Sequence, residues 1–183
     1  MNFWGLPVSA EIGGREYPVN TDFRDVLEII EILQDLDKHE RLRVILALTL
    51  FYEEFEDMTP EEYQAAFDWM LRFIALDEPE DNSPHIKLID WEQDRTIIAA
   101  EINKVAGVEV RDLRYLHWWT FIGYFNGIGE GQLSFIVSIR EKLRKGKKLE
   151  KHEQEFYRNN RARVDFKQKF TQADEATLSK WLI

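Results

Sequence analysis

The sequence predicts a mainly α protein, built as a multi-helix bundle with an N-terminal β-hairpin. Two observations support this fold class. Apolar and polar residues alternate near the start of the chain, on both sides of a Gly13-Gly14 pair, as they do in paired strands. From Phe23 onward, apolar residues recur instead at the three- and four-residue spacing of amphipathic helices, with capping residues and glycines between the segments.

The hairpin is predicted in LPVSAEIGGREYPVN, residues 6–20. Paired glycines tolerate the positive φ angles that a tight hairpin turn requires. Its apolar positions are Val8 and Ile12 before the turn and Tyr17 and Val19 after it. Because an isolated hairpin is only marginally stable, we expect it to pack against the helices that follow.

Three helices are expected next. Thr21 or Asp22 caps the first, because a short polar side chain can accept the unpaired amides of a helix start. Its apolar stripe is Phe23, Val26, Leu27, Ile30 and Leu33. The second helix covers residues 40–55 and is apolar over most of its circumference, which predicts burial on several sides.

The third helix has the clearest start signal, TPEE at residues 59–62. Thr59 is the expected cap, Pro60 the first helical residue, and Glu62 completes a capping box. The apolar stripe that follows is Tyr63, Phe67, Met70, Leu71 and Ile74.

The segment DEPEDNSPHIK, residues 77–87, interrupts the helical pattern with two prolines and four acidic residues. It is the best candidate for a linker. Two organisations are therefore open. The chain forms a single domain over 1–183, or it forms two lobes, 1–76 with the hairpin and helices and 88–183 with helices only, joined by 77–87.

Further helices are expected after residue 88. Asp90 caps one that ends at Gly107 and carries Trp91, Ile98, Ile102 and Val105 on one face. The next covers 113–126 and contains the uncharged stretch YLHWWTFIGYFN. Another, 132–145, ends in Arg and Lys before Gly146, as the helix dipole favours. Leu149, His152, Phe156 and Tyr157 mark one more, and DEATLSKWLI closes the chain with a short amphipathic segment.

Composition excludes several classes of function. The chain has no cysteine, so it has no thiol catalysis, cysteine-ligated zinc or disulfide, which fits a reducing compartment. Its apolar runs fall well short of the roughly 20 residues that span a bilayer, and its start lacks a secretory signal. We therefore expect a soluble cytoplasmic protein with no membrane partner.

Charge is divided unevenly along the chain. Residues 1–139 hold 11 Lys and Arg against 27 Asp and Glu, whereas 140–169 hold 12 against 5. The basic segment can attract nucleic acid or acidic partners, or its acidic neighbours can neutralise it, which is the interpretation we favour. Its candidate surface residues are Lys147, Lys148, Arg161 and Arg163.

The sequence contains no arrangement that points to catalysis. None of the four histidines has the partner spacing of a metal or catalytic site, and we interpret His117 as hydrogen-bonded to the backbone at a core edge. The glycines of GIGEG, 127–131, lack the Lys-Ser/Thr of a phosphate loop and follow a helix, which predicts a helix-to-helix turn. We expect no enzyme activity and no cofactor.

Several motifs occur in series: DWEQD, NKVAG, YLHWWTF, GKKLEK and EFYRNN between residues 90 and 160, with LPVSAEIGGREYPVNTDFR near the start. Together they resemble the bacteriophage gene-product-fifteen family of tailed phages and prophages of Gram-positive bacteria, over most of the chain. Members of this family are encoded just before the tape-measure protein. That position usually belongs to tail assembly chaperones, which keep the tape-measure protein soluble and help to recruit tail-tube subunits.

The resemblance implies a role and no active-site residue. The expected role is a non-enzymatic tail morphogenesis protein, an assembly chaperone in the host bacterial cytoplasm. Its expected partners are the tape-measure protein and, as a second candidate, the major tail protein, and a homo-oligomer stays open. One alternative is a structural tail or connector subunit that remains in the virion. Another is a nucleic-acid-binding phage regulator that uses the basic segment 140–169, which we favour less.

The aromatic stretch at 115–126 is the candidate partner-binding surface, because aromatic side chains offer a large contact area at a low entropy cost. A core or intersubunit helix is the interpretation we favour, and a catalytic pocket is nearly excluded. The candidate residues are Trp118, Trp119, Phe121, Tyr124 and Phe125.

Overall fold

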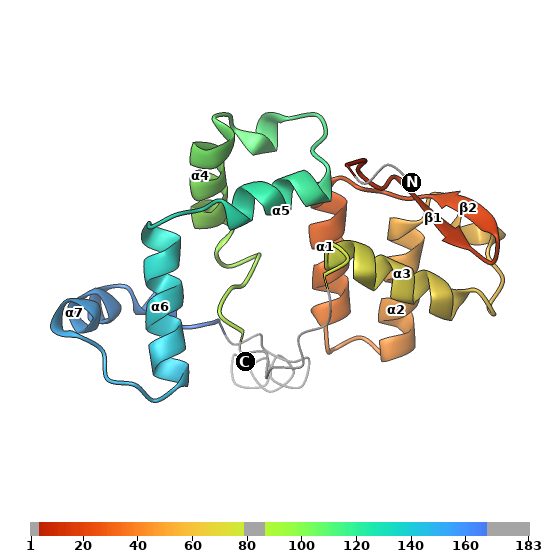
Figure 1. Cartoon of the computed structure of the whole chain (residues 1–183). Coiled ribbons are helices and arrows are strands. Elements are labelled where there is room, and N and C mark those ends of the chain that lie inside the picture. Colours follow the sequence, from red (N-terminus) through yellow and green to blue (C-terminus); the bar gives the residue numbers. More distant parts are fainter. Residues whose placement is uncertain (1–3, 79–86, 168–183) are drawn as a thin grey trace, which may run out of the picture. The chain divides into compact units, whose positions relative to one another are not determined.

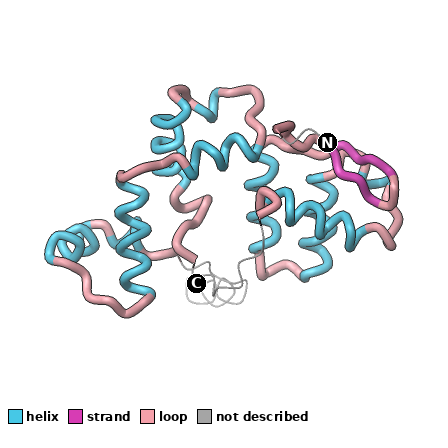
Figure 2. The backbone as a smooth tube through the Cα atoms, viewed as in Figure 1, coloured by secondary structure: helices cyan, strands magenta, loops and turns pink. Residues whose placement is uncertain are grey.

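The computed structural model describes residues 4–78 and 87–167 of the chain. They fall into two compact units. The N-terminal unit comprises Met1–Asp81 and Leu113–Gly123, and the C-terminal unit comprises Asn82–Asp112 and Tyr124–Ile183. The fold is mainly α with an N-terminal hairpin, as predicted, and the elements are shown in Figure 1 and Figure 2. The division into two lobes joined by 77–87 stays a prediction, since most of that linker lies outside the described residues.

The hairpin pairs β1 (Ser9–Ile12) with β2 (Arg15–Pro18) in antiparallel register, with Ala10 opposite Tyr17. Both glycines of the turn have positive φ, +59° and +83°, which is the reason for two glycines here. Ala10, Ile12 and Tyr17 are buried, as is Val19 just after β2. Val8, one of the apolar positions of the predicted hairpin, lies just before β1 and is exposed.

Helices α1 (Phe23–Gln34) and α2 (Glu40–Phe51) form a closely packed pair (Figure 1). Asp22 caps α1 by accepting a hydrogen bond from the Arg24 amide at 3.0 Å. The fully buried positions of α1 are Phe23, Val26 and Ile29. The predicted stripe omitted Ile29, and its members Leu27, Ile30 and Leu33 are only half-buried.

Helix α2 ends at Phe51, earlier than predicted, because Tyr52 turns into extended backbone and pairs with Val19 of the hairpin. A short 3-10 turn, Phe55–Asp57, follows. Burial on several sides of α2 was a wrong prediction. Only the side with Ala47, Leu48 and Phe51 is fully buried, and two leucines on the helix are exposed.

Helix α3 (Tyr63–Ile74) begins after a turn at residues 60–62, so Pro60 precedes the helix instead of starting it. Half of the capping box forms, since Glu62 accepts the Thr59 amide at 2.8 Å. The buried residues are Ala66, Met70 and Phe73, whereas Leu71 is exposed. The predicted stripe was therefore rotated by about one residue.

The C-terminal unit contains α4 (Arg95–Ala106), the 3-10 turn Val110–Asp112, α6 (Gln132–Arg144), α7 (Lys151–Asn159) and α8 (Arg161–Val164). Asp90 accepts the amides of Glu92 and Gln93 within a turn. Helix α4 begins only at Arg95, after Asp94, so the prediction that Asp90 caps this helix and that Trp91 lies on it is wrong. Gly107 and Gly146 have φ of +72° and +63° and end α4 and α6, as predicted. The closing segment DEATLSKWLI lies outside the described residues.

The core of this unit is aliphatic and includes Ile98, Ile102, Leu133 and Ile136. Val105, predicted on the buried face of α4, is exposed. Around α7, Ile139, Leu149 and Val164 form a cluster against which Phe135, Phe156 and Tyr157 pack. Within the described parts of the chain, no helix has the length and apolar character needed to cross a membrane.

Candidate functional site

The aromatic stretch forms an extended segment followed by α5 (Trp118–Asn126), a helix shorter than the one predicted over 113–126. The extended segment pairs with the start of α1. The Phe23 amide donates to the Leu116 carbonyl at 3.0 Å, and the Trp118 amide donates to the Thr21 carbonyl at 2.7 Å. These bonds join residues nearly one hundred positions apart in sequence.

The two adjacent tryptophans complete the C-terminus of α3. Trp118 donates its ring Nε1–H to the Ile74 carbonyl at 3.0 Å, and Trp119 donates its ring Nε1–H to the Phe73 carbonyl at 2.9 Å. The last carbonyls of a helix have no partner within the helix, so they need donors from elsewhere. The pair of tryptophans supplies two of them.

His117 is buried and hydrogen-bonded to the backbone through both ring nitrogens, which agrees with the sequence interpretation. Its Nδ1 accepts the Trp119 amide at 3.0 Å. An amide can only donate, so Nδ1 is unprotonated, and Nε2–H donates to the Pro7 carbonyl at 2.9 Å. Burial lowers the pKa of His117 below its usual value. The imidazole is therefore a neutral structural link and has no substrate-facing nitrogen.

Burial divides the five aromatic candidates. Trp118 and Phe121 are 2% and 3% exposed, and Phe121 stacks on Phe23 with ring centroids 4.4 Å apart. Both belong to the core and offer no surface to a partner. Trp119, Tyr124 and Phe125 are half-buried, with Phe125 packed on Trp91 at 5.0 Å. Partner binding through these three stays a prediction.

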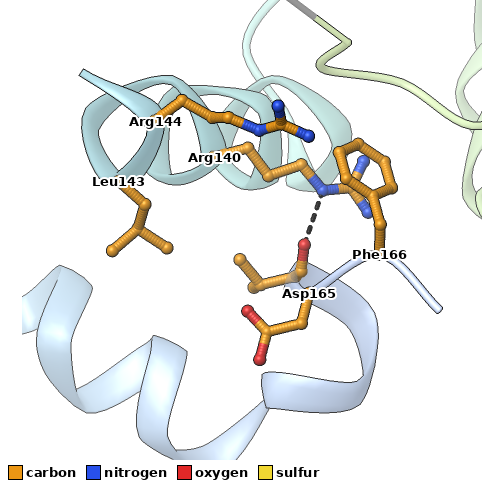
Figure 3. A pocket seen from close by; sticks show the side chains of 6 residues that line it. Arg140, Leu143, Arg144, Asp165 and Phe166 are labelled. Atoms are coloured by element: carbon orange, nitrogen blue, oxygen red, sulfur yellow. Dashed lines mark hydrogen bonds between the residues drawn. The ribbon is translucent and has the colours of Figure 1, made fainter. Parts of the chain in front are cut away.

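Arg140, from the basic segment, is neutralised inside the C-terminal unit. Its guanidinium forms a bidentate ion pair with Asp94 at 2.6 and 2.9 Å, and both side chains are 2% exposed. Its remaining donors bond to the carbonyls of Leu88, Arg163 and Val164 at 2.7–2.9 Å, the last through Nε (Figure 3). All five guanidinium N–H groups are thus satisfied, as a buried charge requires.

Two more cations of the segment have acidic partners. Lys142 pairs with Glu153 at 2.6 Å, which raises the pKa of Lys142 and lowers that of Glu153, and Lys145 pairs with Glu141. Neutralisation by neighbours therefore holds for part of the segment.

The four predicted basic surface residues behave differently. Lys147 and Lys148, after α6, and Arg161 and Arg163, in α8, are exposed. None of the four has an ion pair with a carboxylate in the described ranges, and Arg161 lies over the Tyr157 ring at 5.4 Å.

An open pocket of about 340 Å³ lies between α6 and the end of α8 (Figure 3). Its walls are formed by Arg140, Leu143, Arg144, Val164, Asp165 and Phe166. Three cations surround the Phe166 ring: Arg140 at 4.3 Å, Lys87 at 5.4 Å and Arg144 at 5.8 Å. The Asp165 carboxylate accepts the Tyr157 hydroxyl at 2.9 Å.

The glycine-rich stretch 127–131 connects α5 to α6, as the predicted helix-to-helix turn. The buried Glu101 carboxylate lies against Gly131 at the start of α6, where a Cβ on Gly131 would be 2.9 Å from Glu101 Oε1. A carboxylate of the protein therefore lies beside the start of α6. Among the residues that the structure describes, no group of His, Asp and Glu is arranged to hold a metal ion.

The family model described as bacteriophage Gp15 protein matches residues 5–166. The chain belongs to this family. The predicted resemblance is thus confirmed, and the protein is phage-related. Searches of curated proteins and of solved structures found no match.

Sequence reasoning missed two features of this Gp15-family chain. Arg140 was counted within the basic segment 140–169, although it follows Leu133 and Ile136 by seven and four residues and so shares their buried helix face. That spacing was the available signal. The exposed leucines of α2 had no such signal, because an all-round apolar helix predicts burial.

Proposed function

We propose that this Gp15-family protein is a non-enzymatic phage tail morphogenesis protein. In this proposal it is an assembly chaperone that binds the tape-measure protein in the host cytoplasm and presents it to tail-tube subunits. Support comes from the family and from the genome position that the resemblance implies for its members.

The observation that carries the proposal is the pair of exposed leucines on α2. Leu42 and Leu46 are 48% and 37% exposed, and their four-residue spacing places them on one face of the helix. They replace Trp118 and Phe121 as the best candidates for partner contact, since those two are buried. An apolar helix face is the kind of surface that receives an amphipathic partner helix.

Charge in the same unit favours a basic partner. The N-terminal unit holds 20 Asp and Glu against 7 Lys and Arg. Such an excess steers a partner helix whose polar face carries Lys and Arg and repels an acidic one. Because both leucines are already more than half buried, covering each contributes roughly 1 kcal/mol, so a contact of this size is reversible, as a chaperone requires.

Co-expression with the cognate tape-measure protein tests the role. We expect more of the tape-measure protein in the soluble fraction and its co-purification with this chain. If its solubility does not change and the two proteins do not co-purify, the chaperone role is wrong.

Leucine variants locate the contact. The double variant Leu42→Ser/Leu46→Ser should keep its fold and lose co-purification, whereas Leu36→Ser, at an 83% exposed leucine outside α2, should bind as the wild type does. Equal binding by all three proteins would exclude the α2 face.

Mass spectrometry of purified particles separates the chaperone from the structural alternative. A chaperone should be absent from the virion, and a tail or connector subunit should be present in many copies.

A second candidate, a nucleic-acid-binding regulator, is favoured by the exposure of Lys147, Lys148, Arg161 and Arg163. Salt-dependent retention on DNA that disappears when these four residues are neutralised would support it.

A further inference from the structure

The pocket at the end of α6 joins an apolar wall to a cation that has no acidic partner among the described residues. We propose that this pocket binds an acidic peptide segment of a partner protein, which inserts one apolar side chain beside Arg144. The site is in the C-terminal unit, so the proposal does not rest on the α2 surface or on the chaperone role.

The apolar wall comes from Leu143, Val164 and Phe166 (Figure 3). Leu143 is 38% exposed, which is high for a leucine in the last turn of a helix beside a buried cluster. The pocket volume of about 340 Å³ is at the lower end of the roughly 300–1,000 Å³ of ligand sites. This space suits one large side chain more than an extended ligand.

The cation available to a ligand is Arg144. Arg140 also lines the pocket, but all five of its N–H groups are already bonded to Asp94 and to three carbonyls. Arg144 is exposed and lies over the Phe166 ring at 5.8 Å, and it donates no hydrogen bond to a residue in the described ranges. A free guanidinium can hold a carboxylate through two parallel hydrogen bonds.

The surroundings of the pocket attract acidic segments. Eight exposed cations between 144 and 167 have no ion pair with a described carboxylate: Arg144, Lys147, Lys148, Lys151, Arg158, Arg161, Arg163 and Lys167. The exposed carboxylates of the same stretch are Glu150, Glu155 and Asp165. This excess of positive charge raises the rate at which an acidic partner arrives.

The pocket favours a peptide over a nucleic acid for two reasons. A base would need an open aromatic face, but cations pack against the Phe166 ring, the nearest being Arg140 at 4.3 Å. The apolar wall of Leu143 and Val164 also matches an aliphatic side chain, which a phosphate backbone does not offer. An aliphatic side chain flanked by carboxylates meets both conditions, since its acidic groups can lie on the Arg144 side.

Binding to the full chain can be measured by fluorescence anisotropy with three labelled probes: an oligoglutamate peptide with one central leucine, the same peptide with serine in that place, and an oligothymidylate of equal charge. We expect the leucine peptide to bind roughly tenfold more tightly than the serine peptide, because one leucine side chain is removed from water. It should also bind more tightly than the oligothymidylate.

Two variants test the geometry. Arg144→Glu should weaken the leucine peptide about tenfold or more, as expected for loss of a charge-assisted pair, and Leu143→Asn should abolish the preference for leucine over serine. Arg158→Glu makes the same charge change at an exposed cation outside the pocket and should have a smaller effect. Both Arg variants should melt like the wild type, since neither residue is buried.

Several results would overturn the proposal. If the two peptides bind equally, or if Arg144→Glu and Arg158→Glu weaken binding equally, the peptides bind by general electrostatic attraction and not in the pocket. Tighter binding of the oligothymidylate would identify a nucleic-acid surface. No binding of either peptide to the full chain would exclude the site outright.

Discussion

The two units of this protein hold distant segments together by different means. In the N-terminal unit, residues 113–123 are joined to α1 and α3 by aromatic burial and by neutral hydrogen bonds from Trp118, Trp119 and His117. In the C-terminal unit, Arg140 joins Asp94, Leu88 and the end of α8 through an ion pair and three carbonyl bonds. The first arrangement gains most of its stability from apolar area removed from water.

This difference predicts which substitutions destabilise each unit most. Truncating a buried aromatic side chain lowers the free energy of unfolding in proportion to the volume removed. At a buried ion pair, the loss is largest when one charge is left without its partner. Substitutions of similar size should therefore destabilise the N-terminal unit through lost apolar burial and the C-terminal unit through an unpaired buried charge.

Trp118→Ala should have the largest effect. It removes a side chain that is 2% exposed, with an expected loss of about 3–5 kcal/mol. It also leaves the Ile74 carbonyl without its donor, which costs roughly 1 kcal/mol more. Thermal melting followed by near-UV circular dichroism measures the loss. Trp118→Phe keeps most of the side-chain volume and should lose much less stability. Equal losses of stability in the two variants would contradict burial as the main contribution of Trp118.

Arg140→Met should cost about 3–5 kcal/mol, because Asp94 is left as a buried charge without a partner. Asp94→Asn should also destabilise. The double variant should be more stable than Arg140→Met alone, since it removes both charges. Urea denaturation of the four proteins gives the coupling energy. If the stability losses of the two single variants simply add in the double variant, the ion pair does not stabilise this unit.

Gly131→Ala should have a smaller effect, about 1 kcal/mol, because its Cβ would meet Glu101 Oε1 at 2.9 Å and the carboxylate at the end of this flexible side chain must move. Gly129→Ala is the matched control, since its Cβ would meet nothing within 4 Å. The two melting temperatures should differ, with Gly129→Ala close to the wild type. A melting temperature for Gly131→Ala that equals that of the control would refute tight packing at the start of α6.

Acidification from pH 7 to pH 5 should have the smallest effect, and in the N-terminal unit it acts on the histidine link. Burial lowers the pKa of His117, so the fold favours the neutral imidazole. Stability is then fully present above the unfolded pKa of about 6.5 and falls as pH drops through the folded pKa. Urea midpoints between pH 7 and pH 5 should decrease more for the wild type than for His117→Gln. If the urea midpoints of the two proteins change equally with pH, His117 does not cause the loss of stability.

Local signals in the sequence predicted element ends well. Asp22, Gly107 and Gly146 cap or end helices as expected, and Gly13-Gly14 forms the hairpin turn. Each of these depends on one side chain or one φ angle acting on its nearest neighbours. Such effects are decided within a few residues, so the sequence contains them in full.

Burial was predicted less well. Ile29 was missed, and Leu71 and Val105 were placed inside although they are exposed. A helix with apolar residues on several faces does not say which face meets a neighbour, and that choice depends on the direction in which the helices pack. The exposure of Leu42 and Leu46 on α2 follows from the same cause.

The fold class, several helix ends, the hairpin turn and the family could be predicted from the sequence, because these depend on local chemistry and on ordered motifs. The folded structure was needed to show that two tryptophans complete α3, that Arg140 is a buried partner of Asp94, and that a pocket lies beside Arg144. Each of these joins residues between 20 and 50 positions apart. Whether such a residue is a surface cation or a buried partner depends on the groups that folding places next to it.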